Sequence, residues 1–251
     1  MILTWEHILL IVLVGILTGF INTLSGSGSL ISLPILMFIG LPPHVANGTN
    51  RVGILFQNLV GTGNYYRKGV LDMQIGVEVA VPAILGSIVG AYVVSGLSAR
   101  AVEISVAVVL LLMLIPIWFK PKQWLEGKDM SGVKHNKPLR WGIFFLIGAY
   151  GGFIQAGVGI FLLSALVLNV GYNLVKANAV KVFINLLFTP FALGVFIWQG
   201  QVDWGVGLVL AAGNAIGAWF ASQWSIAWGP AFVRYVLIVV ILGSGIKLLF
   251  F

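Results

Sequence analysis

Long apolar runs, separated by short polar or glycine-rich stretches, cover most of the 251-residue chain and divide it into ten segments. A helix needs roughly 20 apolar residues to cross the hydrocarbon core of a bilayer. Two segments, 28–40 and 158–171, are short and follow glycine-rich breaks, so we predict half-helices or re-entrant helices there. Whether they span the membrane fully stays open. The ten segments are 6–24, 28–40, 44–66, 74–96, 100–119, 139–157, 158–171, 174–199, 203–222 and 229–250.

The composition favours lipid as the solvent of this chain. It is 59% hydrophobic and 8% charged, whereas soluble proteins carry about 25% charged residues. A soluble all-α protein could not cover so apolar a surface. The start carries Glu6 but no basic residue and no cleavage site, so the first apolar segment is expected to remain as a helix. These features predict an all-α integral membrane protein that crosses the bilayer several times.

The net charge of +7 does not indicate nucleic-acid binding, because six of the 14 basic residues lie together at 120–140. Basic loops stay on the cytoplasmic side of membranes. We therefore predict a first membrane repeat over 1–119, a basic cytoplasmic loop over 120–138 and a second membrane repeat over 139–251. The chain has no cysteine and its three histidines are far apart, so neither a metal site nor a cofactor is expected.

The two halves of the chain repeat each other. A shift of 131 positions places Ala46-Asn47 on Ala177-Asn178 and Asp72 on Asp203, and a shift of 133 places Gly19-Phe20-Ile21 on Gly152-Phe153-Ile154. The loop 67–73 carries Arg67 and Lys68, whereas its repeat partner 200–203 has no basic residue. This asymmetry favours two inverted repeats of about five membrane segments each, an architecture of many secondary transporters.

Polar stripes on the third and eighth segments are the main candidate for a site. At about 100° per residue, the polar residues of each segment share one face. Lipid cannot face such a stripe, so the stripes must face each other or a wet cavity. Their members include Asn47, Asn50, Arg51 and Asn58 in the first half and Asn178, Lys181, Asn185 and Thr189 in the second.

Arg51 and Lys181 each lie roughly 10 Å inside a segment at 1.5 Å rise per residue. Each buried cation costs about 2.5–3.5 kcal/mol on an insertion scale, and no Asp or Glu lies in the middle of a segment to offset it. A positive, polar cavity without acids favours an anion as the missing partner. The alternative is that both cations reach an interface or bind backbone carbonyls.

The glycine-rich breaks carry two interpretations. Gly26, Gly28, Gly157 and Gly159 could free backbone N–H groups at helix starts, which bind anions. They could equally allow close helix packing, the better interpretation of the pairs Gly86/Gly90 and Gly213/Gly217.

Several motifs together resemble the sulfite exporter (TauE/SafE) family of bacterial permeases. They are Gly19-Phe20-Ile21, the run from Gly40-Leu41-Pro42-Pro43 through Asn47-Gly48-Thr49-Asn50-Arg51, then Arg67-Lys68-Gly69 with Asp72, and the echo at Ala177-Asn178-Ala179. The chain alternates serine and glycine where that family often has a glycine run, and it has Val180 where a small hydroxyl residue is common.

The resemblance implies export of a small sulfur-containing anion (sulfite, sulfoacetate or a related organosulfonate) across the bacterial cytoplasmic membrane. We expect a secondary transporter that works by alternating access, with a passive channel for a small anion or neutral solute as the alternative. A membrane-embedded enzyme is disfavoured, since no set of catalytic residues is present. The expected partners are the anion and the lipid bilayer, and a homodimer is compatible with the sequence. The expected substrate-binding residues are Asn47, Thr49, Asn50, Arg51, Asn58, Asn178, Lys181, Asn185, Gly26, Gly28, Gly157 and Gly159.

Overall fold

The computed structural model describes residues 5–102, 104–105 and 137–250, and these residues form helices and turns with no strand. The predicted segment 100–119 and the basic loop 120–138 lie almost entirely outside the described residues. Elsewhere the predicted segments match the helices within a few residues. The helices are α1 (Trp5–Ser25), α2 (Ser29–Phe38), α3 (Pro43–Arg67), α4 (Met73–Ser95), α8 (Lys137–Phe153), α9 (Val158–Ala165), the π-helix η1 (Leu166–Val170), α10 (Leu174–Trp198) and α11 (Trp204–Phe250).

Two predicted segments need correction. The segment 139–157 was too long, because α8 ends at Phe153 and the next residues form a turn in which Gln155 and Gly157 have positive φ angles of 66° and 74°. The segment 158–171 is not one regular helix, since α9 passes into η1. The predicted division near residue 229 is present, because Gly229 interrupts α11 with φ 72° and ψ −168°.

Four described helices are long and apolar enough to cross a membrane: Trp5–Ser25, Met73–Ser95, Leu174–Trp198 and Trp204–Gly229. The helix α3 has 25 residues but carries the polar stripe. The helix α2 has 10 residues, so at 1.5 Å rise per residue it covers about half of a 30 Å hydrocarbon core. The chain is therefore a multi-pass helical membrane protein with short helices after its glycine-rich breaks.

Local sequence signals explain where the helices begin. Proline opens α3 at Pro43, as its fixed φ suits the first helical position. The Asp72 side chain accepts a hydrogen bond from the N–H of Ile75 and caps α4, and Asp203 caps α11 through Val206 in the same way. Asn173 caps α10 through the N–H of Lys176. Repeat-related aspartates thus begin repeat-related helices.

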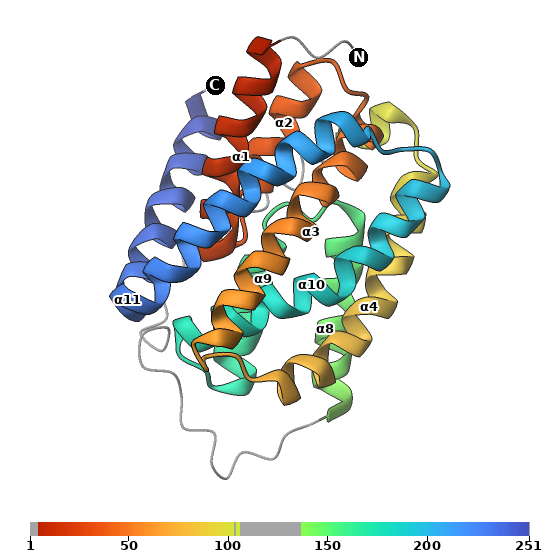
Figure 1. The fold of residues 1–251 in the computed structure, drawn as a ribbon. Coiled ribbons are helices and arrows are strands. Elements are labelled where there is room, and N and C mark those ends of the chain that lie inside the picture. The colour runs from red at the N-terminus through yellow and green to blue at the C-terminus, as the bar shows by residue number, and fades with distance from the viewer. Residues whose placement is uncertain (1–4, 103, 106–136, 251) are drawn as a thin grey trace.

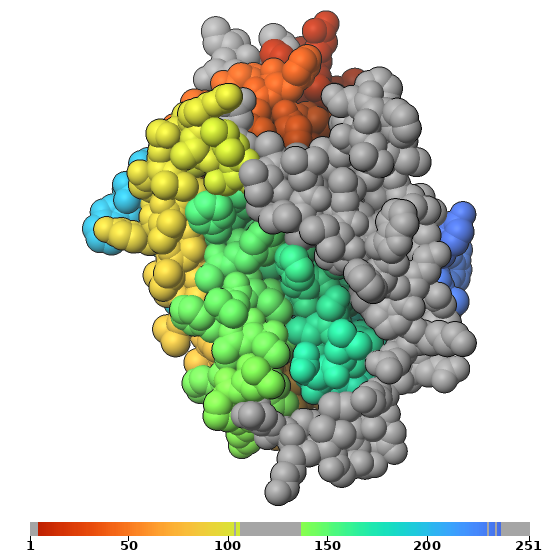
Figure 2. All heavy atoms as spheres, turned by 180° about the vertical axis from the view of Figure 1, so that it is seen from behind, coloured from red at the N-terminus to blue at the C-terminus, as the bar shows by residue number. Residues whose placement is uncertain are grey.

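The helices α3 and α10 run antiparallel through the middle of the bundle (Figure 1). Tyr65, near the end of α3, accepts a hydrogen bond at 2.9 Å from Asn178, near the start of α10. Thr49, near the start of α3, accepts one at 2.9 Å from the N–H of Asp203, which follows α10. The helix α1 packs against α11 on one side of this pair (Figure 1). On the other side α4 packs against α8 (Figures 1 and 2).

The two outer helix pairs use matching glycine contacts. A Cβ atom added at Gly86 or Gly213 would overlap backbone of the facing helix, and the same holds one turn later at Gly90 and Gly217. The predicted small-residue packing is therefore confirmed at both pairs. Gly86 and Gly213 are related by a shift of 127 positions, not 131. The backbone atoms that these glycines face correspond as well. Gly86 faces Phe145 O and Ala149 N, as Gly213 faces Val12 O and Ile16 N. Gly90 faces Ala149 O and Phe153 N, as Gly217 faces Ile16 O and Phe20 N.

Left-handed glycines also occur in pairs at the shift of 131. Their φ angles are 76° and 74° for Gly26 and Gly157, 100° and 86° for Gly40 and Gly171, and 67° and 67° for Gly69 and Gly200. Only glycine adopts this region without steric cost. The two halves therefore turn their backbones in the same way at three corresponding places.

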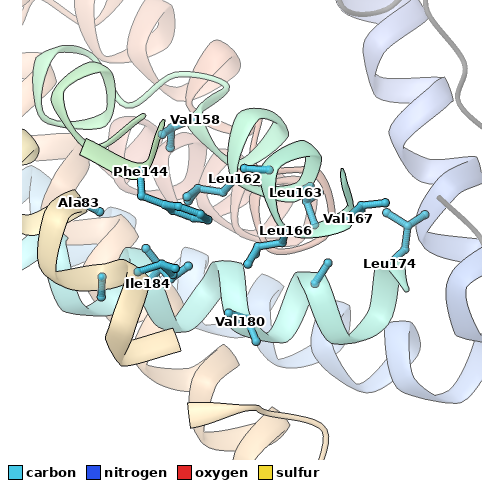
Figure 3. Packing of buried hydrophobic residues seen from close by; sticks show 14 of the residues in the cluster. Ala83, Phe144, Val158, Leu162, Leu163, Leu166, Val167, Leu174, Val180 and Ile184 are labelled. Carbon is cyan, nitrogen blue, oxygen red and sulfur yellow. The ribbon is translucent and has the colours of Figure 1, made fainter. Parts of the chain in front are cut away.

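The short helix α9 is buried in protein rather than in lipid. Its Leu162 and Leu163, followed by Leu166, point toward Val180 and Ile184 of α10 in a cluster of fully buried side chains (Figure 3). Phe144 of α8 and Ala83 of α4 belong to the same cluster. This packing holds the segment that follows the break after α8 against α10.

Candidate functional site

The break after α1 and the break after α8 meet at Gly26 and Gly159. A Cβ atom on either glycine would overlap the backbone of the other. Gly28 is equally tight, since its Cβ would overlap the Thr18 carbonyl oxygen. Close packing, one of the two interpretations of these glycines, is therefore present. Anion binding by backbone N–H groups at Gly26, Gly28, Gly157 and Gly159 stays a prediction.

Arg51 of α3 is fully buried and reaches the end of α8. Its Nη1 donates to the carbonyl oxygen of Gly151 at 3.0 Å and to Oε1 of Gln155 at 2.9 Å. Its Nη2 donates to the carbonyl oxygen of Gly152 at 2.6 Å and to Oδ1 of Asn47 at 3.4 Å. Carbonyls in the last turn of a helix carry partial negative charge, so the end of α8 suits a guanidinium.

Lys181 of α10 repeats this arrangement at the end of α1. It is fully buried, and its Nζ donates to the carbonyl oxygens of Asn22 at 3.2 Å and Thr23 at 2.8 Å. Both carbonyls lie in the last turn of α1, which ends at Ser25. Each half of the chain thus supplies a buried cation to the first helix of the other half.

Neither cation has a carboxylate partner among the described residues. Two ion pairs among those residues join Arg140 to Glu78 at 2.6 Å and Lys176 to Asp72 at 3.2 Å. The binding of both cations to backbone carbonyls, which the sequence left as an alternative, is present. Carbonyl dipoles offset a buried charge only in part.

Three predicted binding residues of α3 are occupied by protein partners. Asn50 donates to Oγ of Ser29 at 3.1 Å and accepts from Ser32 at 2.7 Å. Asn47 donates to the carbonyl oxygen of Phe153 at 2.8 Å. Thr49 receives the N–H of Asp203. These side chains hold α2, α8 and α11 against α3, and their contact with a substrate stays a prediction.

The other predicted asparagines keep unpaired polar atoms. Asn178 donates to Tyr65, but its Oδ1 is buried without a hydrogen-bond partner. Asn58 accepts from Gln57 at 3.4 Å, and its Nδ2 is unpaired. Asn185 has an unpaired Oδ1. A buried polar atom without a partner costs about 1–3 kcal/mol, so these three side chains have unused hydrogen-bonding capacity.

The sequence did not single out Gln155 and Asn22, which lie at the two breaks. Gln155 has a φ of 66°, which is uncommon for a residue other than glycine. Its side chain accepts from Arg51 and donates to Thr189 at 3.1 Å. Asn22 donates to Gln57 at 3.2 Å. A signal existed: the repeated Gly-Phe-Ile runs both end in an amide residue, Asn22 in one and Gln155 in the other.

A second polar cluster joins the two halves where α4 and α10 begin. Tyr172 donates to Oδ2 of Asp72 at 2.7 Å, and the Lys176 ammonium lies 3.2 Å from the same oxygen and 4.4 Å from the Tyr172 ring centre. Partial burial would raise the pKa of Asp72, but hydrogen bonds from Tyr172 and the N–H of Ile75, with the ion pair to Lys176, together hold that pKa below its ordinary value. The carboxylate therefore stays charged.

Residues 11–248 match the family described as "Sulfite exporter TauE/SafE". The match covers both halves, including the two breaks and the helices α3 and α10. No solved structure matches the chain significantly.

Curated relatives are similar over most of their length. A protein of Sinorhizobium named "Probable membrane transporter protein ORF9" is 27% identical over 93% of this chain and 88% of its own. A "Probable membrane transporter protein" of Haemophilus influenzae is 26% identical over 90% of this chain and 88% of its own. The "Probable membrane transporter protein YfcA" of Escherichia coli K12 is 27% identical over 94% of this chain and 87% of its own.

Proposed function

The chain belongs to the sulfite exporter TauE/SafE family, and from this we propose that it is a secondary transporter for a small sulfur-containing anion. The substrate class is sulfite, sulfoacetate or a related organosulfonate, exported across the bacterial cytoplasmic membrane by alternating access. The names of its relatives, probable membrane transporter proteins, support transport as the function.

One observation supports an anion as the substrate. Arg51 and Lys181 are fully buried inside the bundle and meet carbonyl oxygens but no carboxylate in the described part of the chain. A buried charge without a counter-charge is costly, and a bound anion would offset part of that cost. A cation or a strongly basic solute would add to it.

The proposed architecture is two inverted repeats with the substrate held between them. Three features support it: the antiparallel course of α3 and α10, the paired left-handed glycines, and the matching contacts of α1 with α11 and of α4 with α8. In transporters built this way the substrate site lies near the bilayer midplane, beside interrupted helices. The contact of the two breaks at Gly26 and Gly159 supports a substrate site beside them.

Counterflow in proteoliposomes tests the function against its alternative, a passive channel. Vesicles loaded with unlabelled sulfite are diluted into a trace of labelled sulfite. A carrier should accumulate the label transiently and should saturate as the substrate concentration rises. A flux that stays linear, without accumulation, would support the channel instead, and no flux of sulfite, sulfoacetate or methanesulfonate would refute both.

Single cysteines test the inversion, because the natural chain has none. Lys68 and Gln199 are exposed and directly follow α3 and α10. In the proposed topology, Lys68→Cys labels with an impermeant thiol reagent from the cytoplasmic side and Gln199→Cys from the opposite side. Labelling of both from one side would rule out inverted repeats.

A further inference from the structure

The surroundings of Lys181 differ from those of Arg51 in unpaired hydrogen-bonding groups. Lys181 contacts the last turn of α1, where the Thr23 hydroxyl is buried without a partner. Two unpaired groups follow on the facing side of α3, the amide nitrogen of Asn58 and, one turn later, the hydroxyl of Thr62. Asn185, one turn after Lys181 on α10, has an unpaired amide oxygen.

Contacts at Gly61 show that the stretches of α3, α10 and α1 that carry these groups pack against one another. A Cβ atom on Gly61 would lie 3.0 Å from Cγ1 of Val182 and 3.8 Å from Cγ2 of Thr23. Gly61 lies between Asn58 and Thr62 on α3, and Val182 directly follows Lys181 on α10. Residues three or four positions apart share a helix face. The face of α3 that carries Asn58 and Thr62 is therefore turned toward the Lys181 end of α10 and the end of α1.

A chain of hydrogen bonds orients Asn58. Asn22 donates to Oε1 of Gln57 at 3.2 Å, and Nε2 of Gln57 donates to Oδ1 of Asn58 at 3.4 Å. The assignment of amide nitrogen and oxygen rests on such networks, and this one leaves the Asn58 NH₂ group as a donor without an acceptor. Rotation of the Asn185 amide by half a turn would present its NH₂ group as well.

The cluster is buried but not sealed. Lys181, Thr23 and Asn58 have no exposed surface, whereas Asn22, Thr62 and Asn185 keep exposed fractions of 8%, 9% and 5%. Arg51 lies in a different setting. Its two terminal nitrogens have four acceptors, and the Phe196 ring covers it at 4.7 Å, so only its Nε is unpaired.

We propose that Lys181, Asn58, Thr62, Asn185 and Thr23 form the subsite for the oxyanion head of the substrate, and that Arg51 positions the break after α8 instead. This inference rests on the proposed function. Hydroxyl and amide N–H groups are neutral donors, so the subsite offers one positive charge, partly offset already by two carbonyls. The desolvation cost rises steeply with ligand charge. The subsite therefore selects a singly charged head group, such as the sulfonate of sulfoacetate or hydrogensulfite, over a doubly charged one such as sulfate.

Calorimetric titration of the purified full-length protein tests this, with sodium methanesulfonate as the probe. We expect saturable binding of methanesulfonate and at least about tenfold weaker binding of sulfate. Asn58→Leu and Asn185→Leu should each weaken methanesulfonate binding about ten- to hundredfold, the value of one hydrogen bond to a charged group. Without ligand, Asn185→Leu should keep or raise the melting temperature, since it removes an unpaired buried atom. Asn58→Leu should change the melting temperature little, because it removes one unpaired atom but also the acceptor of the long hydrogen bond from Gln57.

Thr189→Val is the matched control, because it removes a buried hydroxyl that Gln155 uses on the Arg51 side. We expect a lower melting temperature and unchanged methanesulfonate affinity. Unaltered affinity in Asn58→Leu and Asn185→Leu would overturn the subsite while leaving the transport function intact. Failure of the unmutated protein to bind methanesulfonate, sulfite or sulfoacetate would overturn the proposed function as well. Sulfate binding as tightly as methanesulfonate would refute the selection of single charge.

Discussion

The break after α1 and the break after α8 each receive a buried cation from the opposite half of the chain, yet their surroundings differ. Arg51 has four hydrogen bonds and a covering aromatic ring at the end of α8. Lys181 has two hydrogen bonds at the end of α1, beside hydroxyl and amide groups that have no partner. The two cations lie one position out of register, because the shift of 131 places Asn50 on Lys181. Each still reaches the last turn of a helix, with different surroundings.

Burial of a charge does not by itself locate a ligand. Both cations are fully buried, and both meet helix C-terminal carbonyls. A group that already has hydrogen-bond partners in the folded protein gains little free energy from a ligand. A buried group without a partner has lost its hydration, and a ligand that bonds to it recovers that cost. Unused hydrogen-bonding capacity therefore distinguishes the two breaks better than charge does.

The largest effect is expected where the two breaks meet. Gly159→Ala places a Cβ atom against the backbone of Gly26, and neither backbone can move without shifting α2 or α9. We expect the free energy of unfolding to fall by more than about 4 kcal/mol, which is exceptional for a single substitution. Size-exclusion chromatography in detergent should show little folded protein.

Gly194→Ala is the control, because no atom lies within 4 Å of its added Cβ. It should be neutral or stabilising by up to about 1 kcal/mol, since alanine is the better helix former. A well-folded Gly159→Ala protein would show that the breaks do not pack as described.

Substitution of the two buried cations should give the next largest effects. Arg51→Met removes four hydrogen bonds and leaves buried carbonyls unpaired, so we expect a loss of about 3–5 kcal/mol in the free energy of unfolding. Lys181→Met removes two, with an expected loss of about 1.5–3 kcal/mol. Unfolding in detergent, followed by circular dichroism, measures both. An equal or larger loss in Lys181→Met would contradict a structural role that falls mainly on Arg51.

The second polar cluster, formed by Asp72, Tyr172 and Lys176, should give the smallest effect, and this effect should depend on pH. Because the folded-state pKa of Asp72 lies below its ordinary value of 3.8, its contribution to stability is present above that pH and is lost as the pH falls through the lower folded-state value. Asp72→Asn should cost less than about 1 kcal/mol at neutral pH, since the pair is partly exposed, and this difference should shrink in acid. A difference that is constant with pH would mean that the ionised carboxylate contributes nothing.

The helices were largely predictable because their causes are local. A membrane span demands a minimum apolar length, and Pro43, Asn173 and the paired aspartates Asp72 and Asp203 mark helix starts within a few residues. The breaks were predictable from their glycine-rich sequences. The turn at 154–157 was missed, because Gln155 adopts a left-handed conformation that a residue other than glycine rarely takes, and its partner Arg51 is distant in sequence.

The sequence predicts which residues of the site are buried better than it predicts which atoms they contact. Burial of Arg51 and Lys181 follows from their positions in apolar helices. Which atoms they meet does not, because the carbonyls of Gly151 and Thr23 belong to other helices and every residue has a carbonyl. Thr62 and Thr23 were not predicted for a similar reason. A single threonine is common in a membrane helix, and only the neighbouring helices decide whether its hydroxyl has a hydrogen-bond partner.

The position of a bound anion tests the central claim most directly. Crystals grown with sodium bromomethanesulfonate would reveal the bromine by anomalous scattering and the sulfonate by its density. We predict sulfonate oxygens within hydrogen-bonding distance of Nζ of Lys181, Nδ2 of Asn58 and the side-chain amide of Asn185. A sulfonate bound at Arg51, or bromine found only outside the helical bundle, would contradict the account.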